Sequence, residues 1–507
     1  MVAFVAALGI LMAVLDNTIV NVALVPMASE FGTTYSVIQW VITAFFLAQA
    51  AVIPIAGYLG NRFGMKRSYI IVLCLFTLSS LLCALASTEQ QLILFRVLQG
   101  LAGGALFPLA QAIATEAFPI HERQKGSMII GISVLLGPIF GPTLGGYLID
   151  LFSWPAIFTI NLPVGAITVL LAILSFPPDK KSAPTQRARF DYLGLLLSVA
   201  ASVMLVYAFA LVTDIRPGSA SPLNPRGEMY GWTFWGVWAL LGGGLGLLLA
   251  FVFYELRHND PVLDIRSLKH STFTAPSVML WFMAMIIFGS ILLLPIFFQQ
   301  IRNPHLSATN TGLALMPQGI GAAVATVFAA RLYYKLGVRA LVLIGIALLT
   351  LSGYLLTFFE TDSSGGDVLV ALSIRGLGFG FAFIPLQTLA LQRFMGAELA
   401  KASSLLNVGR QIFASIGVSV IVTMLMQHIT RNMEVLRSQM PPVPEGLGTN
   451  LSALREAMPQ VIAEAGTGAV NEVMWILFFA TAALVVLVPL LPRRKKLVAM
   501  FSAHPVV

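Results

Sequence analysis

One acidic residue of this chain lies in the middle of a long apolar run. Asp16 interrupts the run from Val2 to Val25, which is long enough to form a helix across a bilayer. Of the 22 acidic residues, it alone lies near the middle of such a run. Burying a carboxylate there costs at least about 2.5–3.5 kcal/mol, so we expect it to face a cavity or a partner. Burial opposes the charged form, which suits reversible protonation; the alternative is an acid permanently paired to lock helices together.

Arg96, in a second apolar run, is the natural partner of Asp16. With 1.5 Å of rise per residue, Asp16 lies about 14 Å and Arg96 about 8 Å from the same membrane face. The long arginine side chain can bridge that difference if the two helices pack together. Small movements of the pair could then switch the proton occupancy of Asp16. The alternative is an arginine that extends to the membrane interface.

The elements that must position these residues are membrane-spanning helices. The chain has 507 residues, of which 58% are hydrophobic and 10% charged, which excludes a water-exposed globule of this size. The sequence predicts an all-α polytopic membrane protein with fourteen spans, and the residues left over exclude a large soluble domain. The predicted spans are 2–25, 37–59, 68–86, 91–113, 126–147, 157–176, 191–213, 233–255, 273–298, 308–330, 340–358, 368–390, 403–426 and 472–491.

The basic residues set the predicted topology. Of the 30 Lys and Arg, 21 fall in alternate loops and in the C-terminal tail, six in the other loops and three within spans. The positive-inside rule then places both termini in the cytoplasm of a multi-pass protein of the cell membrane. The net charge of +8 therefore reflects topology rather than nucleic-acid binding. No basic segment precedes the first apolar run, so we expect no cleavable signal peptide.

The sequence divides into two similar halves. The loop Gly57–Arg67 has a weaker echo in Ala329–Arg339, and the stretch Arg96–Gly100 has one in Arg375–Gly378. The offsets are 273 residues for the loop glycines and 279 for the arginines. Such repeats are typical of duplicated six-helix bundles with a binding site between them. The predicted organisation is a first bundle at 1–176, a linker at 177–190, two additional spans at 191–255, a linker at 256–272, a second bundle at 273–491 that contains a long outer loop at 427–471, and a basic tail at 492–507.

Polar and small residues within the spans are further candidates. In span five, small residues allow close helix approach and prolines bend the helix, which suits either simple packing or control of opening between the halves. Polar residues within spans often line pathways, although bonding between helices is the commoner role. The candidates for a substrate cavity are Asn17, Asn21, Thr43, Gln99, Gln111, Gln318, Asn407, Arg410 and Gln411. Arg410 stands out because an unpaired charge is costly there.

Four segments together resemble the major facilitator superfamily, and more narrowly its fourteen-span drug/proton antiporter family of multidrug exporters. They are Leu15–Leu24, the Gly57–Arg67 loop, Arg96 with Gln99 and Gly100, and the stretch Gly137–Gly146. Phe190–Gly194 and Asp260–Asp264 resemble the central segment of that family. The resemblance covers nearly the whole chain. It implies two six-helix bundles plus two extra central helices, and proton-driven export of amphipathic, often cationic compounds by alternating access.

The resemblance also assigns roles by position. Asp16 and Arg96 would couple transport to protons. Gly137, Pro138, Gly141, Pro142, Gly145 and Gly146 would form the antiporter helix. The loop residues Gly57, Asn61, Arg62, Gly64, Lys66 and Arg67 would form a cytoplasmic latch. Asn61 stands where the family usually has Asp, so a charged latch here must be weaker or use another acid.

Other function classes fit the sequence less well. No Gly-x4-Gly-Lys-Ser/Thr loop occurs, which argues against an ATP-driven pump. The six histidines are scattered through loops and the tail, so we expect no enzyme, no metal and no cofactor. A receptor without transport would leave Asp16 unexplained. Export of a lipid, siderophore or peptide, and uptake by symport, remain alternatives, and neither the substrate nor an accessory periplasmic protein is identified by the sequence.

Overall fold

The computed structural model describes residues 1–118, 123–179, 191–212, 214, 229–257, 263, 265–358, 360–363, 365–394, 396–439 and 450–492. Within these ranges the chain is all-helical. Most of the linker 177–190, the segment 258–262, Asp264 and the tail 493–507, for which we made predictions, lie outside the described residues.

The first bundle consists of the helices up to Ser175. They are α1 (Val2–Phe31), α2 (Tyr35–Ile38), α3 (Trp40–Phe63), α4 (Met65–Ala84), α5 (Glu89–Glu116), α6 (Arg123–Phe152), α7 (Ala156–Thr159) and α8 (Asn161–Ser175). Helix α1 packs against α5, α6 and α8, and α3 and α4 both pack against α5. Asp16 in α1 therefore faces the interior of this bundle rather than lipid.

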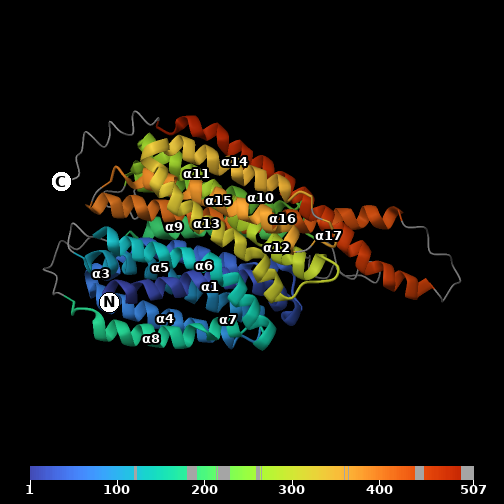
Figure 1. The fold of residues 1–507 in the computed structure, drawn as a ribbon, viewed down its shortest axis with the longest axis horizontal. Helices are drawn as coiled ribbons and strands as arrows, with labels where there is room; N and C mark the ends of the chain where they lie inside the picture. Colours follow the sequence, from blue (N-terminus) through green and yellow to red (C-terminus); the bar gives the residue numbers. More distant parts are fainter. Residues whose placement is uncertain are drawn as a thin grey trace.

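The second bundle follows two further helices, α9 (Tyr192–Val212) and α10 (Trp235–Arg257). Its elements are η2 (Ile265–Lys269), α11 (Ser271–Ile291), α12 (Leu293–Ile296), the π-helical η3 (Phe297–Ile301), α13 (Ala308–Leu336), α14 (Val338–Leu355), α15 (Gly365–Leu391), α16 (Gly396–Gln439), α17 (Asn450–Ala483) and η4 (Leu484–Leu490). Figure 1 shows the two bundles side by side along their long axes. They contact each other through α6 with α13 and α3 with α16, while α9 packs against α16.

Twelve helices of the described chain are long and apolar enough to cross a membrane. Our count of fourteen is therefore not confirmed by length and composition. Helices α3 and α6 are missing from the twelve, although they have 24 and 30 residues. Each of them contains a shorter apolar stretch, Trp40–Ile53 in α3 and Ile139–Phe152 in α6.

The segment 427–471, which we predicted as a long outer loop, is helical wherever the structure describes it. Helix α16 continues to Gln439 and α17 begins at Asn450. At 1.5 Å per residue, the 44 residues of α16 extend for about 66 Å, about twice the roughly 30 Å of the hydrocarbon core. The two helices project together from the end of the molecule opposite the N-terminus (Figure 1). The prolines of this segment at 441, 442, 444 and 459 suggested a loop, but the first three fall between the two helices and Pro459 lies within α17.

Candidate functional site: a buried carboxylate network

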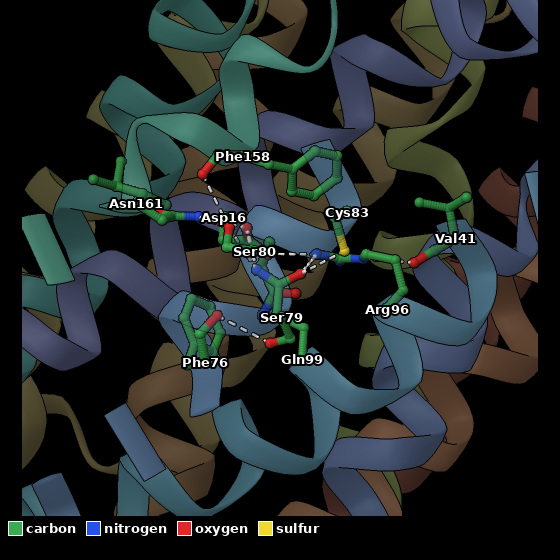
Figure 2. A network of polar contacts seen from close by, with 12 residues as sticks. Asp16, Val41, Phe76, Ser79, Ser80, Cys83, Arg96, Gln99, Phe158 and Asn161 are labelled. Carbon is green, nitrogen blue, oxygen red and sulfur yellow. Dashed lines mark hydrogen bonds and ion pairs between the residues drawn. The ribbon is translucent and has the colours of Figure 1, made fainter. Parts of the chain in front are cut away.

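Asp16 is held in the first bundle by three side chains from two other helices. Its Oδ2 lies 2.5 Å from Nη1 of Arg96 in α5. Its Oδ1 accepts hydrogen bonds of 2.9 Å from Nε2 of Gln99 and 2.9 Å from Nδ2 of Asn161 (Figure 2). Asp16 and Arg96 are each only 1% exposed. The predicted contact between these two residues is thus confirmed, and both carboxylate oxygens have partners.

Arg96 makes more contacts than the ion pair alone. Its Nε donates to the carbonyl oxygen of Val41 in α3 over 2.9 Å, and Nη1 also donates to Oε1 of Gln99 over 2.7 Å. Its guanidinium carbon lies 4.0 Å from the ring centroid of Phe45 and 5.7 Å from that of Phe158, close enough for cation–π attraction. The arginine therefore connects α1, α3 and α5, so a change at the Asp16 carboxylate alters the contacts between these three helices.

Ser80 and Asn161 complete the network and were missed by sequence reasoning. The Ser80 hydroxyl accepts from Nδ2 of Asn161 over 2.9 Å and from Nε2 of Gln99 over 3.2 Å, and donates to the carbonyl oxygen of Phe158 over 3.0 Å. Both residues are buried. Each is a polar residue inside a predicted span, which was the available signal. Serine is common within membrane spans and asparagine is common near the start of a helix, so neither residue stood out in the sequence.

The charge balance of this network makes it sensitive to a proton. With Asp16 ionised, the two buried charges compensate each other. A proton on Asp16 would leave the Arg96 guanidinium buried without a counterion in this arrangement. Breaking a buried pair in this way typically costs about 3–5 kcal/mol. Protonation is therefore expected to favour a different arrangement of α1, α3 and α5.

The glycines of α6 allow two close helix contacts. A Cβ at Gly137 would lie 2.3 Å from the Val14 side chain of α1, and a Cβ at Gly141 would lie 1.9 Å from the Thr18 hydroxyl. Thr18 donates from its hydroxyl to the carbonyl oxygen of Gly137 over 3.0 Å. Helix α6 therefore packs directly against the helix that carries Asp16. Gly145 faces Ile19 of the same helix, while nothing is described of the Pro138 side chain.

The end of α6 also closes one end of the molecule between the bundles. A Cβ at Gly146 would lie 2.1 Å from the carbonyl oxygen of Ala308, at the start of α13. The Asp150 carboxylate accepts from the backbone N–H groups of Ala308 (3.2 Å) and Thr309 (2.8 Å). A negative charge at a helix N-terminus is favourable. Glycine packing and this charge-assisted contact thus join the two halves at the same place, and the Pro142 carbonyl lies next to Gly312 there.

The predicted latch loop uses an acid that lies far away in the sequence. The Asp179 carboxylate accepts from the backbone N–H groups of Lys66 (2.8 Å) and Arg67 (3.1 Å), at the start of α4. Gly64 adopts a φ of 93°, and a Cβ there would meet Asp179. The Lys66 ammonium donates to the carbonyl oxygens of Ile173 and Phe176, each over 2.7 Å. An aspartate after α8 thus caps the start of α4. Arg62 lies over the Phe63 ring, and the surroundings of Gly57 and Asn61 lie outside the described part.

Removing this cap is expected to destabilise the first bundle. Asp179→Ala leaves two backbone donors at the start of α4 without their acceptor, which typically costs about 0.5–2 kcal/mol. We expect a lower Tm for the purified chain in thermal unfolding than for the control Asp362→Ala, which removes an exposed acid from a loop of the second bundle. Equal Tm values for the two variants would contradict a capping role of Asp179.

The cavity candidates do not gather at one place. Gln99 belongs to the Asp16 network. Gln411 in α16 donates to Oε1 of Gln49 in α3 over 3.0 Å, and the buried Thr43 accepts at its carbonyl from Ser415, so these residues join α3 to α16 across the bundles. The Arg410 guanidinium lies 5.7 Å from the ring centroid of Phe383 in α15. Asn17, Asn21 and Asn407 form hydrogen bonds within their own helices. The Gln318 carbonyl lies next to Gly376 of α15, and Gln111 is half-buried in α5.

The chain is similar to curated proteins that are named for multidrug resistance, multidrug export or fatty acid resistance. "Multidrug resistance protein B homolog" of Mycobacterium tuberculosis is 36% identical over 433 residues, covering 84% of this chain and 76% of the relative. "Multidrug export protein EmrB" of Escherichia coli is 30% identical over 487 residues, covering 93% of this chain and 91% of the relative. "Fatty acid resistance protein FarB" of Neisseria gonorrhoeae is 30% identical over 418 residues, covering 82% and 79%.

The fold and the family agree with these relatives. The structure titled "Crystal structure of D-xylose-proton symporter" aligns with a TM-score of 0.60 at 14% identity, over 97% of this chain and 98% of that chain. A bacterial homologue of the lysosomal transporter Spinster aligns with a TM-score of 0.61 at 16% identity, over 96% of both chains. The model of the Major Facilitator Superfamily matches residues 6–418. The chain therefore belongs to the major facilitator superfamily and is a membrane transporter rather than an enzyme.

Proposed function

We propose that this transporter is a proton-coupled antiporter that exports amphipathic, often cationic compounds across the cell membrane by alternating access. The observation that supports this most strongly is the buried Asp16–Arg96 pair, whose carboxylate is the one acidic group near the middle of a predicted span. The names of the multidrug relatives support the export of varied compounds. The direction of transport and the driving ion are the parts that need an experiment.

In the proposed cycle, Asp16 carries the proton. A proton that enters from the outer side neutralises Asp16 and weakens its attraction to Arg96, and the helices around the pair rearrange. The contacts of Gly146 and Asp150 with the start of α13 hold the outer end closed in the state described here. Release of the proton to the cytoplasm restores the ion pair. Substrate then moves outward while the proton moves inward, and Gly137–Gly146 allows α1 and α6 to slide against each other.

The proposed topology has fourteen crossings with both termini in the cytoplasm. The twelve apolar helices and the shorter apolar stretches of α3 and α6 make up this number. Helices α9 and α10 form the pair between the two six-helix bundles. The start of α1 and the end of η4 lie at the same end of the molecule, away from the projecting α16 and α17 (Figure 1), which fits two termini on one side.

Transport by purified protein in vesicles tests this proposal. With an imposed pH gradient, uphill movement of a lipophilic cation such as tetraphenylphosphonium, against the direction of proton flow, is expected. Collapse of the pH gradient with a protonophore should abolish the uphill movement. Transport that is unchanged by collapse, or that runs in the same direction as the protons, would contradict antiport.

A second candidate substrate class is supported by one relative. FarB is named for fatty acid resistance, and it is as similar to this chain as EmrB is. Fatty acids are anionic amphiphiles, so export of such acids is a specific alternative to export of cations. Transport of laurate instead of the cation in the same vesicles distinguishes export of fatty acids from export of cations.

Arg410 is expected to influence which charges the substrate may carry. Its guanidinium lies against Phe383, between α16 and α15, and is half-buried. Arg410→Ala removes a positive charge that repels cations and attracts anions, so we expect tighter binding of tetraphenylphosphonium and weaker binding of anionic dyes. The matched control is Arg410→Lys, which keeps the charge. Unchanged binding of both probes by Arg410→Ala, with normal expression, would show that Arg410 has no part in substrate selection.

A further inference from the structure

The second bundle repeats the helix packing that surrounds the Asp16 network. In the first bundle that network lies among α1, α4, α5 and α8, and in the second α11, α14, α15 and α17 pack in the same pairs. The start of α14 also resembles the start of α4, because Gly337 has a φ of 80° and Gly64 a φ of 93°. The second bundle therefore contains a place equivalent to that of the carboxylate network.

Arg375 of α15 occupies the position of Arg96 in this arrangement. Its side chain is 7% exposed, and its Nη2 donates to the hydroxyl of Ser290 in α11. Within the described residues this is the only hydrogen bond that Arg375 makes, although a guanidinium carries five N–H donors. No acidic side chain in the described part of the chain forms an ion pair with it. Arg96, in contrast, has the Asp16 carboxylate as its counterion.

The charge of Arg375 requires a counterion. A buried guanidinium loses its hydration, and this loss is strongly unfavourable unless a negative charge compensates it. Ser290 has a neutral hydroxyl where α1 has the Asp16 carboxylate, so it accepts a hydrogen bond but compensates no charge. A water molecule beside the arginine would also leave the charge uncompensated. A dissolved anion supplies both a hydrogen-bond acceptor and the missing negative charge.

A small cavity beside Arg375 limits the size of that anion. Its volume is about 30 Å³, which is close to the volume per molecule in liquid water. A halide ion is only slightly larger than a water molecule, whereas a carboxylate with an alkyl chain or a phosphate ester needs more room. The polar residues that line the cavity besides Arg375 are Ser290, Ser352 and Thr481. Each of their hydroxyls donates to a backbone carbonyl, which leaves the N–H groups of Arg375 as the donors for a ligand.

We propose that this cavity binds a monatomic anion, chloride under physiological conditions, on the Arg375 guanidinium. The rest of the lining is apolar and includes Met283, Ile287 and Leu477, so the attraction between the ion and the guanidinium is only weakly screened by solvent. The first bundle thus carries its counterion on α1, and the second bundle takes its counterion from solution. The site lies within one bundle and includes neither the Asp16 network nor Arg410.

Thermal unfolding of the purified full chain in detergent, at constant ionic strength, tests this site. Potassium gluconate is replaced stepwise by potassium chloride, since gluconate is too large for the cavity. A ligand that binds only the folded state raises the Tm in a saturable manner, and we expect a rise of about 2 °C or more. Potassium bromide should act similarly, because bromide is also a monatomic anion. Equal Tm values in gluconate and chloride would show that the cavity holds water alone and would overturn the proposal.

Two variants separate the site from general salt effects. Arg375→Gln removes the charge and is expected to lose the chloride-dependent rise in Tm. The matched control is Arg331→Gln, which removes an exposed arginine of α13 and should keep the rise. A rise of equal size in Arg375→Gln and in the control would also overturn the proposal.

A third variant keeps the test decisive if Arg375→Gln does not fold. Ser290→Asp supplies from α11 the carboxylate that α1 supplies to Arg96. In gluconate it is expected to have a higher Tm than the unchanged chain, and chloride should add no further rise. A chloride-dependent rise as large as that of the unchanged chain would contradict an anion on Arg375. Because the readout is thermal stability rather than transport, either outcome leaves the proposed antiport to its own test.

Discussion

An Asp16→Asn variant is expected to lose gradient-driven efflux almost completely while it still binds substrate. Asparagine keeps the size of the side chain and one carbonyl oxygen, but it carries no titratable proton. It also leaves the Arg96 guanidinium without its counterion, at a cost of about 3–5 kcal/mol for the arrangement described here. We therefore expect uphill transport of tetraphenylphosphonium in vesicles to fall at least about tenfold, which corresponds to about 1.4 kcal/mol.

The control for this variant is Glu30→Gln on the same helix. Glu30 is exposed and accepts from Nε1 of Trp154 over 2.8 Å, outside the Asp16 network. The Glu30→Gln variant should transport tetraphenylphosphonium nearly as well as the unchanged chain. Because loss of the buried pair can also destabilise the fold, the Tm and the expression of both variants need to be measured. Well-folded Asp16→Asn with intact uphill transport would show that the carboxylate carries no coupled proton.

Gly146→Ala is expected to have the second largest effect, through the contact between the bundles. The added Cβ would meet the Ala308 carbonyl oxygen at 2.1 Å, and a backbone atom in a helix has little room to move. The outer end can then no longer close as described, so we expect transport to fall about tenfold or more. Cysteines introduced near this end should become more accessible to water-soluble thiol reagents.

Gly131→Ala is a matched control on the same helix. Apart from the nearby backbone of α6 itself, no atom lies within 4 Å of a Cβ built at Gly131, and alanine is the better helix former. This variant should keep full transport and equal or higher stability. If Gly146→Ala transported as well as Gly131→Ala, close packing of α6 against α13 would not be needed for the cycle.

The sequence predicts the centre of the site better than its surroundings. Asp16 and Arg96 are charged residues in apolar runs. The free-energy cost of burying each charge in the membrane singles out both residues as functional candidates and suggests that they pair. Ser80 and Asn161 carry no charge, and only the packing of α8 against α1 and α4 shows that Asn161 bonds the carboxylate and Ser80 bonds Asn161. Polar candidates such as Asn407 and Gln411 look alike in sequence, yet one bonds within its helix and the other across the bundles.

The remaining differences concern contacts and lengths that local patterns do not encode. The acid that caps the start of α4 is Asp179, which lies 113 positions after Lys66, and no local sequence pattern predicts a contact over that separation. The α16–α17 projection continues as helix beyond the apolar spans, because polar residues can sustain a helix outside the bilayer. The internal repeat, in contrast, predicted that Arg375 corresponds to Arg96, although not that Ser290 would stand opposite it.

Proton release on substrate binding is the most direct test of the central claim that Asp16 couples transport to protons. The purified chain in a weakly buffered solution with a pH-sensitive dye receives tetraphenylphosphonium at a series of pH values. If substrate and proton compete for the network around Asp16, addition should release protons from the unchanged chain and none from Asp16→Asn. Equal release by both proteins, or no release by an unchanged chain that demonstrably binds and transports the cation, would contradict it.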